Sequence, residues 1–321
     1  MASTIVQPGT LGKLVLAALL TACERPPEPP AGELRFDGER ALARVGELLT
    51  LPRALGDPAR PAALDRLEAL LRDAGAVRVE RLEHTGDDPL TGRSFAMTTL
   101  VGAVRPDAPH QFILASHFDV RPWAESDPDP ARRDSPIPGA NDGTSGVAVL
   151  LELAPLLAAQ LPPDIGFSLI LFDGEELGRP GVGPYCAGST ALAAALLARR
   201  FPVVRAASFG VVLDMVGDRD LQLLKEPRSL RTNPELVDRI WSTGQAAGFP
   251  QFVAASAPEP LTDDHVPLSD VGIPSILVID YTYPAWHTHA DTIDMLSAAS
   301  LGAVGETLRL ALRAEWKART R

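Results

Sequence analysis

The sequence predicts an α/β fold, in which a single domain carries a central mixed, mostly parallel sheet with helices on both faces. Its short apolar runs lack polar alternation, as is typical of strands that are buried on both sides. These runs alternate along the chain with segments of helical periodicity, which is the pattern of α/β proteins. The composition of the 321 residues, 45% hydrophobic and 22% charged, is that of a folded globular chain, and one α/β domain commonly reaches this length.

The first residues indicate an export segment ahead of that domain. Lys13 precedes Leu14–Ala22, a run of nine small and aliphatic residues. A helix that spans a bilayer takes about 20 residues, so this run is too short to span and instead suits the core of a signal peptide. The run ends in Leu20–Cys23, which resembles the lipobox of bacterial lipoproteins, where the cysteine becomes the lipidated first residue. A plain secretory signal with a chance cysteine is the alternative.

These features divide the chain into three parts. We expect a signal peptide over residues 1–22, a lipidated Cys23 with a Pro-rich linker over 23–35, and the folded domain over 36–321. A Pro-rich segment forms a stiff spacer. We therefore expect an exported, membrane-anchored lipoprotein that faces the periplasm or the cell exterior and meets the membrane only through its lipid anchor.

The folded domain begins with two segments of helical periodicity and two apolar strands. Apolar residues recur at helical spacing over residues 37–51 and 58–74, which predicts two amphipathic helices. Strand-like runs follow at Val77–Leu82 and Phe95–Val104.

Three further apolar runs predict buried strands, and polar residues follow each of them. These runs are Phe112–Ala115 before His117, Phe167–Phe172 before Glu175 and Glu176, and Val211–Leu213 before Asp214. Helical segments alternate with them, and a last strand and a last helix complete the chain. The predicted ranges are Thr144–Ala159, Gly188–Arg200 and Pro234–Ala247 for the helices, Ser275–Ile279 for the strand, and Leu296–Trp316 for the final helix.

The charge and the cysteine content exclude two classes of protein. Thirty Lys and Arg stand against 41 Asp and Glu, a formal net charge of −11, whereas nucleic-acid-binding domains carry a basic face. Cys23 and Cys186 are the only cysteines, too few for a disulfide-stapled fold. We expect no nucleic-acid partner and no disulfide framework.

The polar residues after the strands predict a site at one edge of the sheet. Ligands of open α/β sheets bind outside the carboxyl ends of the strands, where His117, the glutamate pair and Asp214 are expected. Loops add Asp142 and His287. Each residue alone has an ordinary explanation, since Asp142 could cap a helix, but gathered carboxylates repel each other unless a cation binds. Histidine with carboxylates and no thiolate fits Zn²⁺ in an open catalytic site.

The same residues resemble a known superfamily, in order and over roughly residues 40–316. The motifs are His117-Phe118-Asp119, the Asn141–Gly146 loop, Glu175-Glu176, Leu213-Asp214-Met215, and His287-Thr288 with Asp291-Thr292. Together they are similar to the zinc aminopeptidases. That superfamily also contains the animal-type glutaminyl-peptide cyclotransferases, or glutaminyl cyclases, and the two branches remain to be distinguished.

Three motifs favour the cyclase branch. Phe172–Glu176 looks like the cyclase form of the glutamate pair, and Tyr283–Thr288 is similar to the cyclase segment that puts aromatic residues beside the zinc histidine. Asp263–Pro267 resembles the cyclase double-Asp motif, where aminopeptidases usually place Ser before a single Asp-His. Against this, Gly143–Gly146 is peptidase-like, and Leu177–Pro180 stands where cyclases carry a tryptophan.

The cyclase resemblance implies a role for each site residue. One Zn²⁺ would be held by Asp142, Glu176 and His287, catalysis would depend on Glu175, Asp214 and Asp263, and Trp286 and Tyr283 would line the substrate pocket. The enzyme would be an acyltransferase that converts the N-terminal glutamine of peptides or proteins to pyroglutamate and releases ammonia. Glu175 would move the proton, Asp214 and Asp263 would form a hydrogen-bonded acidic pair, and His117 would lie behind the ligands, oriented by Asp119.

The aminopeptidase resemblance implies a second zinc ion. That ion would be held by His117 and Asp214, with Asp142 bridging the two metals, and Glu175 would deprotonate a water that attacks the first peptide bond. A non-catalytic scaffold is a third possibility, but the base and the ligands are all present. Asp263 and Trp286 favour the cyclase. His289 matches no ligand position of the superfamily, so we expect it to face solvent.

Overall fold

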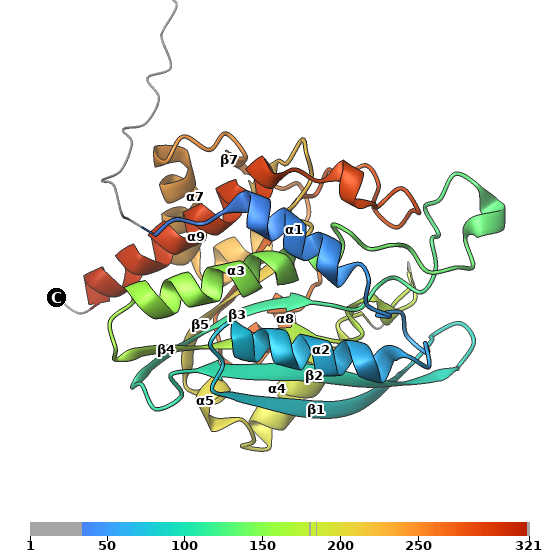
Figure 1. Cartoon of the computed structure of the whole chain (residues 1–321), viewed down its shortest axis with the longest axis horizontal. Helices are drawn as coiled ribbons and strands as arrows, with labels where there is room; N and C mark the ends of the chain where they lie inside the picture. The colour runs from blue at the N-terminus through green and yellow to red at the C-terminus, as the bar shows by residue number, and fades with distance from the viewer. Residues whose placement is uncertain (1–33, 180, 184, 320–321) are drawn as a thin grey trace, which may run out of the picture.

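The computed structural model describes residues 34–179, 181–183 and 185–319, and its centre is a six-stranded sheet (Figure 1). The strand order is β1-β2-β4-β3-β5-β8. The strands are β1 (Arg78–Asp87), β2 (Ser94–Val104), β3 (His110–His117), β4 (Ile165–Phe172), β5 (Ala207–Asp214) and β8 (Ser275–Ile279). The pairs β1-β2 and β2-β4 are antiparallel, and the other three neighbouring pairs are parallel. The predicted mixed, mostly parallel sheet is confirmed.

Helices cover both faces of this sheet, as predicted (Figure 1). On one face lie α1 (Gly38–Leu48), α2 (Arg60–Asp73), α3 (Thr144–Gln160), α7 (Pro234–Ala246) and α9 (Ala298–Arg319). On the other lie α4 (Ala187–Leu197), α5 (Pro202–Arg205) and α8 (His265–Asp270). The short helix α6 (Pro227–Thr232) contacts the edge strand β8.

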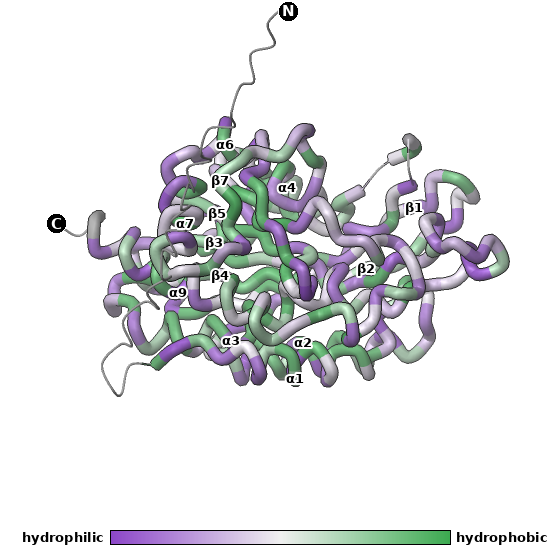
Figure 2. The backbone as a smooth tube through the Cα atoms, turned by 90° about the horizontal axis from the view of Figure 1, so that it is seen from above, coloured by the Kyte–Doolittle hydropathy of each residue, from purple (hydrophilic) through white to green (hydrophobic). Residues whose placement is uncertain are grey.

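The central strands are apolar on both sides because each face packs against helices. In β3, Phe112 and Leu114 join the core under α3 and α9, while Ile113 and Ala115 join the core under α4. Successive side chains of a strand point to opposite faces, so an uninterrupted apolar run is what this position requires. Figure 2 shows the hydrophobic segments gathered along the central strands.

The edge strand β1 is longer than predicted. The sequence predicted Val77–Leu82, whereas the strand runs to Asp87 and pairs with β2 along its whole length. Leu82 is its single buried residue, so the outer half carries no apolar signal. Backbone pairing with β2 rather than burial of side chains holds this half in the sheet.

Several short elements were not predicted at all. They are α5, α6 and α8, the 3₁₀ turns Pro130–Arg132, Glu175–Leu177 and Ile293–Met295, and a second sheet of β6 (Leu223–Lys225) and β7 (Phe252–Ser256). Segments of three to six residues are too short to show a period. The final helix begins at Ala298 rather than Leu296, because the 3₁₀ turn before it ends with Leu296 in an extended conformation.

The export segment lies outside the described residues. This holds for the signal peptide over 1–22, for Cys23 and for most of the linker. Within the described ranges, no helix has the length and apolar character needed to cross a membrane.

Candidate active site

Three parallel neighbours, β4, β3 and β5, bring the predicted polar residues to one edge of the sheet. His117 is the last residue of β3 and pairs with Phe172, the last residue of β4. Asp214 is the last residue of β5, and β5 lies on the other side of β3. The glutamate pair follows β4 after Asp173 and Gly174. The predicted convergence at the carboxyl edge is therefore confirmed.

The turn that carries the two glutamates is held by Asp119. Gly174 adopts φ 80°, a conformation that glycine takes without steric cost, and the 3₁₀ turn Glu175–Leu177 follows. The Asp119 carboxylate accepts hydrogen bonds from the amides of Glu175 (3.3 Å) and Glu176 (3.2 Å). It also lies 3.5 Å from Nδ1 of His117. Asp119 thus fixes the glutamate turn as well as facing the histidine it was predicted to orient.

The loop before α3 presents Asp142 to the site. The N-cap of α3 is Gly143 at φ 83°, without a side-chain cap, so Asp142 does not cap this helix. A Cβ at Gly143 would come within 2.7 Å of the Asp119 carbonyl oxygen and of His117 Cε1. The amides of Asn141 (2.8 Å) and Asp142 (3.2 Å) donate to the carboxylate of Asp291. Glycine and these bonds together fix the direction of the Asp142 side chain.

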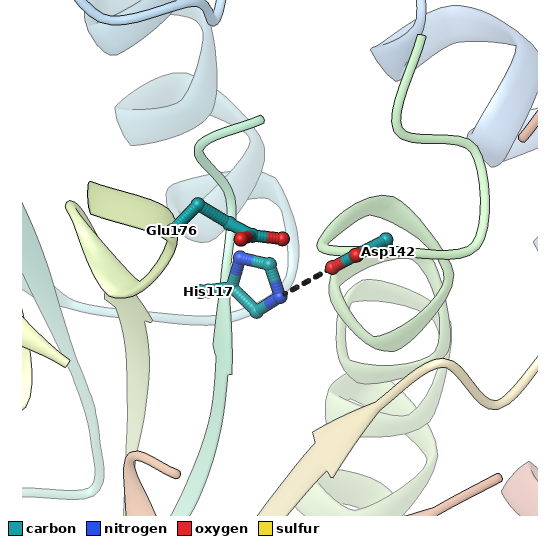
Figure 3. Close-up of side chains that lie close together, drawn as sticks. All are labelled: His117, Asp142 and Glu176. Atoms are coloured by element: carbon teal, nitrogen blue, oxygen red, sulfur yellow. Dashed lines mark ion pairs between the residues drawn. The ribbon is translucent and has the colours of Figure 1, made fainter. Parts of the chain in front are cut away.

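The three predicted zinc ligands lie around one point. His287 Nε2 is 3.8 Å from Asp142 Oδ2 and 3.5 Å from Glu176 Oε2. All three side chains are at least 97% buried. His117 also lies close to Asp142 and Glu176 (Figure 3). One ligand atom from each of these three residues, His117, Asp142 and Glu176, lies within 4.8 Å of the other two.

His117 lies between two carboxylates. Its Nε2 is 3.1 Å from Asp214 Oδ1 and 3.3 Å from Asp142 Oδ1. Burial lowers the pKa of the His117 imidazole, but Asp214 and the other carboxylates around it raise this pKa well above its ordinary value.

The electrostatics of the cluster fit a divalent cation. Burial, and then the charge of Glu176, raise the pKa of Asp142 well above its ordinary value. The buried Oδ2 atom of Asp142 has no hydrogen-bond partner. Two carboxylates and an imidazole nitrogen, without a thiolate, are suitable ligands for an open zinc site. A bound Zn²⁺ would neutralise the repulsion and coordinate the unpaired oxygen.

A cavity of about 520 Å³ opens beside this cluster. It is lined by all of the predicted catalytic and substrate residues, namely Glu175, Asp214, Asp263, Tyr283 and Trp286. The indole of Trp286 is 44% exposed and stacks on the His287 ring, with 3.6 Å between centroids. The Tyr283 ring is buried, and its hydroxyl donates to Asp291 (2.5 Å). Tyr283 therefore supports the Asp142 loop in addition to lining the cavity.

The predicted hydrogen bond between Asp214 and Asp263 is not formed. Between the described side chains of these two residues there is no such contact, and Asp263 Oδ1 instead accepts from the Asp264 amide at 2.5 Å. Burial, and then the charge of Asp214, raise the pKa of Asp263 to about 7. The two carboxyls therefore interact through their charges, and the Asp263 carboxyl uses one of its acceptor oxygens for the amide of the turn.

Sequence reasoning missed two residues that contact the predicted ligands. Glu125 Oε1 lies 2.7 Å from Nδ1 of His287, and Arg121 donates to Glu176 Oε2 at 3.1 Å. Both residues lie in a loop before α3 that matches no sequence motif. There, an Arg and a Glu four residues apart resemble an ordinary surface ion pair.

His289 was predicted to face solvent, and this is wrong. Its side chain is only 11% exposed. Nδ1 lies 2.8 Å from Asp127, and Nε2 lies 3.0 Å from the hydroxyl of Ser135. The loop that carries Asp127 and Ser135 covers the imidazole.

Tyr185 lines the cavity, although no aromatic residue was predicted on that side. It comes nine residues after Glu176, so a search for tryptophan directly after the glutamate pair does not find it.

Comparison with known proteins gives one family and two kinds of relative. Residues 99–312 match the model of peptidase family M28. The glutaminyl-peptide cyclotransferase-like protein of Mus musculus is 28% identical over 281 residues, 80% of this chain and 70% of the mouse protein. Porphyromonas gingivalis glutaminyl cyclase has a TM-score of 0.78 at 32% identity, over 87% of this chain and 99% of its own. A Zn-dependent exopeptidase of Parabacteroides distasonis has a TM-score of 0.78 at 30% identity, over 88% and 99%.

Proposed function

The chain belongs to peptidase family M28, and from that premise we propose that it is a zinc-dependent glutaminyl-peptide cyclotransferase. It converts the N-terminal glutamine of peptides or proteins to pyroglutamate and releases ammonia. The similarity to cyclases from Mus musculus and Porphyromonas gingivalis supports this activity. The similarity to the exopeptidase supports the dependence on zinc.

The observation that carries the proposal is the buried carboxyl of Asp263. It lines the cavity with Glu175 and Asp214, and its pKa is raised to about 7 by burial and by Asp214. A carboxyl that titrates near neutral pH can both donate to and accept from a primary amide, which offers two N–H groups and one oxygen. The serine usual at this position in aminopeptidases also donates and accepts hydrogen bonds, but it cannot carry the negative charge of an ionised carboxyl.

The reaction is an intramolecular displacement. The α-amine nitrogen of the substrate attacks the carbon of its own side-chain amide, the bond from that carbon to the amide nitrogen breaks, and ammonia leaves. Closing a five-membered ring within one molecule avoids the entropy of bringing two reactants together. Asp142, Glu176 and His287 would hold a zinc ion, which would supply Lewis-acid polarisation of the amide carbonyl.

Glu175 is the residue that moves the proton. Burial, and then the charge of Glu176, raise the pKa of Glu175 well above its ordinary value. A base with a raised pKa takes a proton from the attacking amine more effectively and can return it to the leaving nitrogen. Asp214 and Asp263 face the same cavity and are placed to hold the amide during this transfer.

The number of zinc ions distinguishes this proposal from the aminopeptidase alternative. We propose one ion. One arrangement favours a second zinc ion. His117 Nε2 lies 3.1 Å from Asp214 and 3.3 Å from Asp142, and these three groups could hold another cation. Metal analysis of the purified protein gives one zinc per chain if the cyclase proposal holds and two if the alternative does.

Replacing Asp263 tests the proposed function. We expect Asp263→Ser to lower the rate of ammonia release from a glutaminyl peptide by about 10²–10³-fold, the range for losing one hydrogen bond to the reacting group in the transition state. Asp270→Ser is the matched control, because Asp270 is an exposed carboxylate on α8. Unchanged cyclisation by Asp263→Ser would refute the assignment.

The localisation of the protein is a separate proposal, which rests on the lipobox-like segment Leu20–Cys23. We propose an exported lipoprotein whose substrates are peptide or protein N-termini outside the cytoplasm. Metabolic labelling with a fatty-acid analogue should mark the full chain, and Cys23→Ser should abolish the label. A chain that stays unlabelled would refute the anchor.

A further inference from the structure

The predicted zinc histidine, His287, has an unusual backbone. It adopts φ 57°, in the left-handed region that is sterically unfavourable for a non-glycine residue. Such a conformation persists only where the surroundings determine it. Here the amide of Ser126 donates to the His287 carbonyl oxygen at 3.3 Å. The loop that contains Ser126 therefore holds the backbone of the ligand.

The neighbouring residue of that loop, Glu125, holds the ring. Its Oε1 lies 2.7 Å from His287 Nδ1. A carboxylate accepts only, so the proton of the neutral imidazole is on Nδ1 and the lone pair is on Nε2. Nε2 is the atom that faces Asp142 and Glu176. Glu125 thus selects the tautomer that can bind a metal there.

Arg121 connects this carboxylate to a second predicted ligand. Its side chain is fully buried and donates to both oxygens of Glu125, from Nη2 at 2.5 Å and from Nε at 3.1 Å. The same guanidinium donates from Nη1 to Glu176 Oε2 at 3.1 Å and to the Glu176 carbonyl oxygen at 2.9 Å. A fork of this kind fixes direction as well as distance.

We propose that Glu125 is a positioning residue of the zinc site, which Arg121 holds in place, and that it sets the affinity for the metal by fixing the tautomer and the orientation of His287. The inference rests on the zinc ligands of the proposed function. Partners that orient metal-binding histidines typically contribute about 10–100-fold to metal affinity.

A second contact separates this role from simple tethering of the loop. Asp127 accepts hydrogen bonds from the amide of His289 (3.0 Å) and lies 2.8 Å from its Nδ1. Nε2 of His289 lies 3.0 Å from Ser135. These contacts join the loop that carries Asp127 to the segment that carries His287, but they do not touch the His287 ring. His289→Ala therefore loosens this loop and leaves the tautomer of His287 unchanged.

The test is the zinc dissociation constant of the purified protein, measured by competition with a chromophoric chelator. We expect Glu125→Ala to weaken zinc binding by about 10–100-fold and Glu125→Gln by about 10-fold, because glutamine keeps an acceptor but loses the charge that binds Arg121. His289→Ala and the exposed-carboxylate control Asp134→Asn should remain near the wild-type value. A changed visible spectrum of the Co²⁺-substituted Glu125 variants should report the altered ligand geometry, which loosening of the loop would not produce.

The outcomes separate this inference from the proposed function. Zinc affinities of both Glu125 variants within about twofold of wild type would overturn it, as would an equal loss in His289→Ala. Thermal unfolding of the metal-free variants checks that they fold. If Glu125→Ala does not fold, the zinc affinity of Glu125→Gln decides the test. A wild-type protein that binds zinc but releases no ammonia would refute the cyclase and leave the comparison of affinities standing.

Discussion

Glu175 and Glu176 are neighbours in the sequence, but their carboxyls lie in opposite surroundings. Glu176 contacts His287 and Arg121, whose charges lower its pKa below the ordinary value despite burial. Glu175 has no cation in contact among the described residues, and its one side-chain partner there is the thiol of Cys186 at 3.4 Å. Burial and Glu176 therefore raise its pKa. Such divergent environments are how adjacent carboxylates acquire separate roles.

Replacing the two glutamates should separate proton transfer from metal binding. Glu175→Gln should lower turnover of a glutaminyl peptide by about 10²–10⁴-fold, while the zinc content stays at the wild-type level. Glu176→Gln should lower the zinc content itself. Steady-state kinetics and metal analysis on the same preparations measure both effects. Normal turnover in Glu175→Gln would remove this residue from proton transfer.

The position of a site residue could be predicted where the topology of the sheet or a sequence motif constrains it. His117 and Asp214 could be predicted to meet because each ends an apolar strand, and parallel neighbours end at one edge. Glu125 could not be predicted, because its position depends on the course of an irregular loop. Asp263 was located by its motif, but its hydrogen bond was not, since a local turn determines it.

The elements differ in how clearly the sequence marks them. The buried strands and long helices were predicted within a few residues, since they bury a continuous or periodic apolar surface. The outer half of β1 was missed because backbone pairing alone supports it. The short helices α6 and α8 were missed because six residues are too few to show a helical period.

The N-terminus of helix α6 predicts a pH dependence of stability. Its N-cap, Glu226, accepts hydrogen bonds from the amides of Arg228 (2.8 Å) and Ser229 (2.5 Å). Burial raises the pKa of Glu226, but His265 and these amides lower it to about 2. Because the folded-state pKa of Glu226 lies below its ordinary value of 4.5, the stabilisation is complete above this pH and is lost as the pH falls towards about 2.

Glu226→Gln should therefore destabilise the protein in a pH-dependent way. We expect a loss of about 1–2 kcal/mol in the free energy of unfolding at pH 7, as for a lost cap, and a smaller loss at pH 3. Urea unfolding of variant and wild type at the two pH values measures the difference. A loss that is the same at both would contradict the ionised cap.

The whole molecule brings its functional groups together through its topology. The pairs β4-β3, β3-β5 and β5-β8 are parallel, so chain segments far apart in sequence end side by side. The buried cluster then carries an excess of negative charge, which opposes folding unless a cation is bound. Metal binding and global stability should therefore be coupled.

Zinc should raise the thermal stability of the entire domain. A ligand present at 1,000 times its dissociation constant stabilises the folded state by about 4 kcal/mol, which corresponds to a rise in Tm on the order of 8 °C for a chain of this size. Calorimetry of chelator-treated and zinc-loaded protein measures the shift, and His287→Ala should show a smaller one. A midpoint that does not respond to zinc would contradict the metal site.

The most direct test of the cyclase assignment is mass spectrometry of two peptides of equal length, one with N-terminal glutamine and one with N-terminal leucine, after incubation with the zinc-loaded protein. We expect the glutaminyl peptide to lose one ammonia and the leucyl peptide to remain unchanged, because the substrate's own amine and side-chain amide are the reacting groups. Release of free leucine without loss of ammonia from the glutaminyl peptide would contradict it and would establish the aminopeptidase instead.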